Sequence, residues 1–417
     1  MVTRLLEIGY AKTAVNPPIG IKLEGYANRL EPSKCIYDDL YSRCLSLKVK
    51  DTTVSIVVVD SIGIPYSLYT KVLKRSSAFG VDVLLGATHS HSTPSPFEDP
   101  LYEEYLVRSI VGCINASLNN MNNIQHFVVG KSFLPQLIYN RRKPLEGVVD
   151  PEIIAVDSKL ITIVNFTSHP VVLGPNNLCI SSDYPGAAIR WLENITNKNA
   201  MFLNGCCGNI NPYTTSTNIN KPYDRSGGSH EEVKQYGEVL ALEALKSIRL
   251  GERIDLEKCD ELSYKKSVIR LRLRKEVMET ISSLRKANIE SMIVEAEKQG
   301  NVYELWKLKL VKAFLREISE EDLPVPIAVI NLCNKLAFVF LPAEVFVEHQ
   351  LYIKNKSPFK YTIVTCYFNS YWMYIPTKEA FSEGGYEVEP YISIIEPGEG
   401  EKLRDEVVKM LQEVYTG

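Results

Sequence analysis

Two of the six histidines of the chain, His89 and His91, lie two residues apart directly after an apolar segment. On an extended backbone, residues at this spacing face the same side, so both imidazoles can enter one pocket. Imidazole is the commonest metal-ligating side chain, and a pair of histidines at a strand end is a typical beginning of a metal site. A pair of hydrogen-bonded surface histidines fits the same spacing, so the pair alone leaves both interpretations open.

Two further residues are candidates for completing such a site, because catalytic zinc typically takes three protein ligands and keeps one position for water. His169 ends another apolar run, and the proline that follows it stops the strand. Glu344 follows the apolar run 336–341 at a strand-to-helix junction. Each also has a structural interpretation: a His-Pro turn for His169, and a carboxylate in the first turn of a helix for Glu344.

Two polar or glycine-rich segments add candidates. Asp183 opens a helical pattern, where it could cap the helix or orient a metal-bound histidine. The stretch 204–212 is rich in small residues, and these allow a close approach to a ligand or simply a tight turn. A nucleophilic Cys207 is disfavoured, because the spacing indicates neither a base nor an orienting partner for it.

The elements that must position these residues indicate an α/β fold, with mixed β-sheets flanked by helices in one large catalytic domain. A strand at 53–60, a helix at 66–79 and a strand at 81–85 lead into the histidine pair. We expect a helical insertion at 250–323 inside this domain, because candidate site residues lie on both sides of it, and an exposed loop at 213–230. Further strands are predicted at 159–165, 201–203, 327–332, 336–341 and 361–367.

The composition limits the classes of binding partner and the cellular location that we expect. The net charge of -3, with 47 basic and 50 acidic residues well mixed, gives no reason to expect a nucleic-acid partner and favours a small-molecule substrate. The sequence shows no apolar run long enough to be a transmembrane segment and no signal peptide, so a cytoplasmic location is predicted. Nine cysteines, most of them inside apolar runs, indicate reduced thiols, and the adjacent Cys206 and Cys207 suit neither a metal knuckle nor a redox pair.

Taken together and in order, ten short motifs resemble the catalytic domain of neutral (non-lysosomal) ceramidases. The resemblance runs from Gly9 to about Glu387. The motifs are Leu23-Glu-Gly-Tyr-Ala27, Ile36-Tyr-Asp-Asp-Leu-Tyr-Ser-Arg43, Val58-Val-Asp60, Ala87-Thr-His-Ser-His91, Tyr139-Asn-Arg-Arg142, Ser168-His-Pro170, Ser182-Asp183 with Gly186, Gly208-Asn-Ile-Asn-Pro212, Leu341-Pro-Ala-Glu344 and Asn369-Ser-Tyr-Trp-Met-Tyr-Ile-Pro-Thr377.

This resemblance implies a zinc ion, and it assigns the site. The zinc ligands would be His89, His169, Glu344 and Tyr374, the last of which the residues by themselves do not suggest. His91, Arg141 and Tyr386 would surround the scissile amide, and Asp183, Gly205 and Asn209 would be supporting or structural positions. The chain departs from the family in carrying Gly205 about where ceramidases have a serine, and we expect their C-terminal β-sandwich domain to be absent.

The sequence therefore predicts a zinc-dependent hydrolase that cleaves an amide bond of an N-acyl, possibly lipid-like, small molecule with metal-activated water. A zinc esterase or peptidase-like hydrolase uses the same water, and a non-catalytic binding protein with a degenerate site is a third possibility. The sequence does not indicate the substrate, the proton donor to the leaving group or the oligomeric state.

Overall fold

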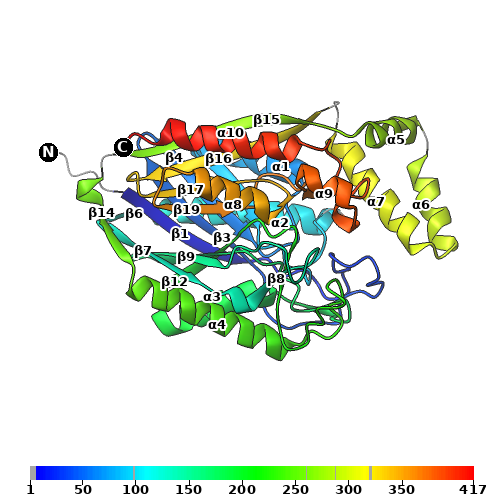
Figure 1. Cartoon of the computed structure of the whole chain (residues 1–417), viewed down its shortest axis with the longest axis horizontal. Coiled ribbons are helices and arrows are strands. Elements are labelled where there is room, and N and C mark those ends of the chain that lie inside the picture. Colours follow the sequence, from blue (N-terminus) through cyan, green and yellow to red (C-terminus); the bar gives the residue numbers. More distant parts are fainter. Residues whose placement is uncertain (1–5, 97–98, 260, 287, 319–321) are drawn as a thin grey trace.

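The computed structural model describes residues 6–96, 99–259, 261–286, 288–318 and 322–417. Strands fill the middle of the molecule and helices lie on its outside (Figure 1). Two helices, α8 (Val347–Lys356) and α10 (Glu399–Val414), run along one side. Another two, α3 (Asp183–Thr196) and α4 (His230–Arg249), run along the opposite side. The mixed α/β architecture predicted from the sequence is confirmed.

Three larger sheets make up this middle layer, and each combines antiparallel pairs with one parallel pair at an edge. The first has the order β5-β4-β3-β1-β6, with β4 and β5 parallel. Its strands are β1 (Leu6–Ala14), β3 (Tyr41–Val49), β4 (Thr52–Val59), β5 (Asp82–Ala87) and β6 (Asn122–Ile124). The helix α1 (Tyr66–Ser76), continued by the 3-10 turn Ser77–Phe79, connects β4 to β5, so the predicted strand, helix and strand before the histidine pair are confirmed.

The second and third sheets repeat this plan. The second has the order β12-β10-β9-β7-β14, with β10 and β12 parallel. Its strands are β7 (His126–Phe133), β9 (Glu152–Asp157), β10 (Ile161–Phe166), β12 (Asn199–Asn204) and β14 (Glu252–Asp255). The third has the order β15-β16-β17-β19, with β17 and β19 parallel. Its strands are β15 (Leu262–Arg272), β16 (Asp322–Leu332), β17 (Leu336–Phe340) and β19 (Tyr361–Thr365).

Both faces of these strands are buried, and the residue order shows how. Along β4, Val54, Ile56 and Val58 belong to an inner core shared by the three sheets, whereas Val57 and Val59 belong to the core beneath the helices. Because side chains alternate between faces, a strand buried on both sides needs a continuous apolar run. This is why the predicted strands appear in the sequence as unbroken Val and Ile segments. The helix α2 (Pro100–Asn119) packs on β1 and β3, and α3 and α4 pack on the second sheet.

The segment 250–323 is helical only in its second half. Its first part supplies the strands β14 and β15, and β15 pairs along its whole length with β16. The helices α5 (Lys275–Lys286), α6 (Ile289–Lys298) and α7 (Val302–Glu317) follow and extend beyond one end of the sheets (Figure 1). Residues 260, 287 and 319–321 of the predicted insertion lie outside the described residues. The prediction of a helical insertion is thus wrong for the first half of 250–323, because residues up to Arg272 alternate between the two faces of an edge strand.

Three two-stranded sheets and several short elements complete the chain. The predicted exposed loop at 213–230 is confirmed as far as residue 229, where α4 is about to begin. The small sheets pair β2 (Cys35–Ile36) with β11 (Cys179–Ile180), β8 (Ile138–Asn140) with β13 (Ile210–Pro212), and β18 (Glu344–Val345) with β20 (Tyr374–Ile375). The remaining short helices are α9 (Lys378–Glu383) and the 3-10 turns Pro135–Leu137, Leu256–Lys258 and Tyr386–Val388.

Four of the nine cysteines form disulfides, which corrects the expectation that all thiols are reduced. Cys35 bonds to Cys179 and Cys259 bonds to Cys333, across 144 and 74 residues of chain. Sequence spacing did not reveal these pairs because the partners are far apart and meet only in the fold. Disulfides are typical of oxidising compartments and of intracellular proteins from hyperthermophiles, so the predicted cytoplasmic location stays a prediction. None of the helices in the described part of the chain has the length and apolarity needed to cross a lipid bilayer.

We predict that the unreduced, denatured protein contains five reactive thiols of its nine cysteines, matching the five free cysteines. Thiol titration in guanidinium, with and without prior reduction, measures this. Cys35→Ser should lower the free energy of unfolding by about 2–5 kcal/mol, because the bond closes a long loop in the unfolded chain. A titre of nine before reduction would contradict the prediction.

Candidate metal centre

Three of the four predicted ligands follow strands of the three large sheets, one from each, and the fourth, Tyr374, lies in the two-stranded sheet of β18 and β20. His89 follows β5, His169 follows β10, and Glu344 follows β17. Each of these strands belongs to the parallel pair of its sheet, and the pairs meet at the site. Asn369 joins β5 to the segment after β19, since its side chain accepts from the Leu85 amide at 3.1 Å and its own amide donates to the Leu85 carbonyl at 2.6 Å.

Strained backbone turns bring the side chains inward. His89 has a φ of 71°, Ala343 beside Glu344 has 64°, and Met373 beside Tyr374 has 59°. Such left-handed conformations are uncommon for residues other than glycine, and they persist where surrounding structure holds them in place. The strain therefore lies immediately next to three of the proposed ligands.

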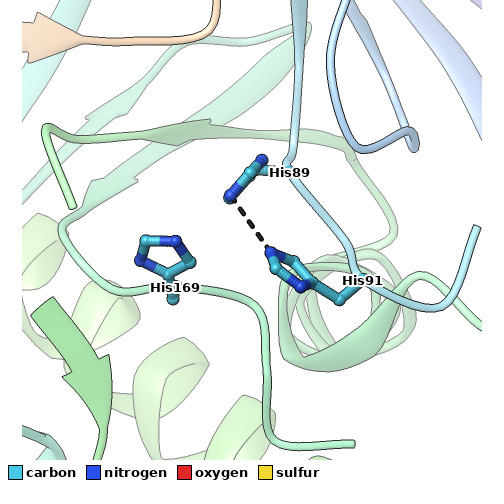
Figure 2. A group of neighbouring side chains, drawn as sticks. All are labelled: His89, His91 and His169. Carbon is cyan, nitrogen blue, oxygen red and sulfur yellow. Dashed lines mark hydrogen bonds between the residues drawn. The ribbon is translucent and has the colours of Figure 1, made fainter. Parts of the chain in front are cut away.

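The ligating atoms of three of these residues lie at contact distances suited to a metal. Glu344 Oε2 is 3.2 Å from His89 Nε2 and 3.0 Å from His169 Nε2. The Nε2 atoms of His89 and His91 are 3.2 Å apart, and Figure 2 shows the three imidazoles facing one another. Four atoms placed tetrahedrally at the usual 2.0–2.1 Å from zinc are about 3.3–3.4 Å from each other. His89, His169 and Glu344 thus approach the spacing that one small cation requires, and His91 lies beside His89.

Backbone carbonyls fix the tautomer of each histidine. Nδ1 of His89 lies 2.6 Å from the Ile62 carbonyl, that of His169 lies 2.5 Å from the Cys207 carbonyl, and that of His91 lies 3.1 Å from the Gly25 carbonyl. Because a carbonyl only accepts, Nδ1 carries the hydrogen, and Nε2 presents a lone pair to the centre. This is the partner that metal-ligating histidines usually have. The donor set fits a metal ion.

The electrostatics favour a neutral imidazole and an ionised carboxylate. Burial lowers the pKa of His169 to about 4, assisted by the nearby Arg141 charge. Burial and the neighbouring His89 and His169 likewise hold the pKa of His91 well below its usual range. Burial alone would raise the pKa of Glu344, but His89 and His169 outweigh it and hold the value well below the usual range. Metal binding requires these protonation states.

Tyr374 lies beside Glu344, since the two are register partners in the parallel pair β18 and β20. Its hydroxyl accepts a hydrogen bond of 2.8 Å from Arg141 Nη2. The buried Arg141 is itself held by Glu387 at 2.8 Å, and the loop residue Tyr223 donates to the same carboxylate at 3.0 Å. The structure thus brings Tyr374 and Arg141 together beside the centre. Tyr386 packs its ring edge-on against Tyr374, 5.9 Å away, and is 41% exposed.

The three supporting positions have structural contacts. The Asp183 carboxylate accepts hydrogen bonds from the backbone amides of Leu173 and Tyr184, at 2.9 Å and 2.6 Å. It therefore fixes backbone and does not bond to the histidine Nδ1 atoms, which bond to backbone carbonyls. Asn209 fixes the start of α8 by accepting from the Val347 amide at 3.0 Å.

Gly205 tolerates no side chain. A Cβ there would lie 2.1 Å from Thr167 Oγ1 and 2.9 Å from Gln350 Oε1. A serine at this position would therefore need the side chains of Thr167 and Gln350 to move.

Several contributing residues escaped the sequence analysis. Tyr371 donates a 2.5 Å hydrogen bond to Glu344 Oε1, and the Tyr367 ring stacks on His89 with centroids 4.2 Å apart. Glu387 secures Arg141. The tyrosines lie in or next to the segment that carries Tyr374, but nothing in their spacing distinguishes a hydrogen-bond donor from a core aromatic residue.

Comparison with known proteins gives a clear structural likeness. No family model and no curated protein sequence matches the chain. The structure resembles that of neutral ceramidase from Pseudomonas aeruginosa, with a TM-score of 0.74 and 16% identity, over 99% of this chain and 75% of that one. A ceramidase complexed with a ligand designated C2 matches with a TM-score of 0.74 and 17% identity, over 99% and 76%. The chain has the neutral ceramidase fold, as the motifs predicted.

We predict that Gly205→Ala lowers the free energy of unfolding by about 1–3 kcal/mol, because the added methyl overpacks a filled site. Chemical denaturation measures this. The double variant Gly205→Ala, Thr167→Ala should recover part of the loss. Gly112→Ala is the matched control, because no atom lies within 4 Å of the added carbon in α2, and it should leave stability unchanged or raised. Equal losses in both single variants would contradict the clash.

Burial raises the pKa of Asp183 to about 6. A carboxyl group that holds its proton more tightly when folded destabilises the protein as pH rises through the window between its unfolded and folded values, here about 4 to about 6. The free energy of unfolding should therefore fall by up to about 3 kcal/mol across this window. In Asp183→Asn the fall in the free energy of unfolding between pH 4 and pH 6 should be smaller. In the exposed control Asp405→Asn this fall should persist. An unchanged slope in Asp183→Asn would exclude Asp183 as its origin.

Proposed function

We propose that this protein is a zinc-dependent hydrolase that cleaves the amide bond of an N-acyl compound. The observation that supports this most is the convergence of two histidine Nε2 atoms on one oxygen of a buried glutamate, within a ceramidase-like fold. His89, His169, Glu344 and Tyr374 would hold the ion. Bound there, zinc would polarise the carbonyl and lower the pKa of a water molecule to roughly 7.

The residues around this centre divide the remaining work. His91 presents a lone pair on Nε2, because its Nδ1 donates to the Gly25 carbonyl at 3.1 Å. It is therefore suited to take the proton of the attacking water and to return it to the leaving nitrogen. This assignment gives a role to the one histidine of the cluster that is partly exposed.

Two donors are suited to the oxygen that gains negative charge when the carbonyl is attacked. Arg141 is a fixed cation whose Nη2 bonds to the Tyr374 hydroxyl, and Tyr386 is an exposed residue whose ring packs edge-on against Tyr374. Donors held in place before the reaction stabilise such charge without reorganising. The carboxylate of Glu387 keeps Arg141 in position.

The substrate is expected to be a small, lipid-like N-acyl molecule, because the structural relatives are ceramidases. An ester reacts with the same water, so a panel of matched amides, esters and peptides given to purified, zinc-loaded protein identifies the preferred bond. Chelation should abolish turnover, and added zinc should restore it. A protein that binds no zinc and shows no turnover on addition of zinc would overturn the proposal and favour a binding protein.

The division of roles among the histidines predicts different outcomes for two variants. His169→Ala should lose bound zinc, because it removes a ligand, whereas His91→Ala should keep the metal and lose about 10²-fold or more in kcat, the range of a general acid-base group. Metal analysis and steady-state kinetics measure both. His230→Ala, outside the cluster, is the matched control and should retain zinc and turnover. Equal zinc loss in the first two variants would make His91 a ligand.

A further inference from the structure

Arg29 carries a buried guanidinium group that is only partly satisfied. Arg29 is only 7% exposed. Nη1 donates to the carbonyls of His91, at 2.8 Å, and Glu24, at 3.3 Å. Nε and Nη2 are buried and have no hydrogen-bond partner. No carboxylate among the described residues lies within ion-pair distance, 4.0 Å, of this guanidinium.

Such an arrangement costs stability unless a partner arrives, because a desolvated charge needs both an opposite charge and hydrogen bonds. Other buried arginines of this protein have them: Arg43 pairs with Asp60, and Arg141 pairs with Glu387, at 2.9 Å and 2.8 Å. Arg225 also has one unpaired nitrogen, but the buried Asp183 lies near enough for Arg225 to lower its pKa. Burial lowers the pKa of Arg29, and the neighbouring Tyr26 and Glu24 oppose this. Arg29 differs from Arg43 and Arg225, which each leave one side-chain nitrogen unpaired, in leaving two unpaired on one edge.

The Arg29 side chain lies beside His91, whose carbonyl accepts from Nη1. The Tyr26 ring has the Arg29 guanidinium carbon 4.8 Å from its centroid and the His91 ring 5.3 Å from it. Nε and Nη2 are the two nitrogens whose N–H bonds run parallel on one edge of the guanidinium, and this edge matches the two oxygens of a carboxylate. A substrate with a neutral end has no opposite charge to pair with the Arg29 guanidinium.

We propose that Arg29 binds a carboxylate of the substrate, so that the enzyme acts on N-acyl amino acids or related anionic amides. This inference rests on the proposed amide hydrolysis. The carboxylate would bridge the Nε and Nη2 edge while the scissile bond lies at the histidine cluster. Its source is either the amine half, as in an N-acyl amino acid, or the acyl half, as in the monoamide of a dicarboxylic acid.

Matched substrates test the proposal at pH 7.5 with the full-length, zinc-loaded protein. N-decanoylglycine and N-decanoylglycinamide differ only in the charge of one end, and kcat/KM should favour the carboxylate at least tenfold. In Arg29→Gln this ratio should fall close to one. Lys22→Gln removes a cation from an exposed position of the same segment and should keep the ratio. A purely structural role of Arg29 would instead lower both values together and leave their ratio unchanged, which would overturn the proposal.

A second pair locates the carboxylate. N-ethylglutaramic acid, compared with N-ethylpentanamide, carries the charge on the acyl side, so a preference confined to this pair supports the site and places the carboxylate in the acyl half. No preference for either anion in the wild-type protein would overturn the proposal.

Binding separates this inference from the proposed function. Isothermal titration of the zinc-loaded protein with N-decanoylglycine and N-decanoylglycinamide needs no turnover. Tighter binding of the carboxylate by at least tenfold, lost in Arg29→Gln, supports the site even if neither compound is cleaved, in which case hydrolysis of this bond is what fails. Equal binding by wild-type protein within this pair and also within the pair N-ethylglutaramic acid and N-ethylpentanamide would overturn the carboxylate site whatever the turnover.

Discussion

The Nε2 lone pairs of two imidazoles, those of His89 and His169, converge on one oxygen of the buried Glu344 carboxylate, and this arrangement suits a cation. The carbonyls of Ile62, Cys207 and Gly25 hold the Nδ1 hydrogens of the histidines, so none of the three rings can turn its acceptor nitrogen away without losing a hydrogen bond. Acceptors that meet at about 3 Å repel one another unless a proton or a metal ion lies between them. Burial makes the repulsion stronger, because the surrounding medium screens little. A dipositive ion held between His89, His169 and Glu344 would remove this repulsion.

The rest of the fold can be understood as the means of holding these acceptors together. Three sheets share one inner core, and each ends its parallel pair near the same place, so strands distant in sequence deliver His89, His169 and Glu344 to one point. Apolar packing on both faces keeps the strands from shifting, since a move of one residue would reverse every side chain. The packing of the core therefore offsets the free-energy cost of the strained turns, such as the one at His89 with its φ of 71°.

A second layer of charge surrounds the centre, and its two sides differ. On one side, Arg141 is balanced by Glu387 and reaches Tyr374, and Tyr223 connects this pair to the long loop before α4. On the other side, Arg29 contacts His91 only through a carbonyl and keeps one edge unpaired. The balanced side suits a fixed electrostatic role in catalysis, and the unbalanced side suits the recognition of an anion. The same residue type thus serves two purposes because its neighbours differ.

The sequence by itself determined the local elements and much of the proposed site. Unbroken Val and Ile runs identify the doubly buried strands around His89, and motif order indicates the fold, because both are properties of short segments. Long-range pairing was decided only by the tertiary structure. The Cys35 and Cys179 bond, the pairing of β15 with β16, and the contact of Tyr371 with Glu344 each join segments whose mutual distance no local pattern encodes. The unpaired edge of Arg29 is of the same kind, since a missing partner can be recognised only after every neighbour has been placed.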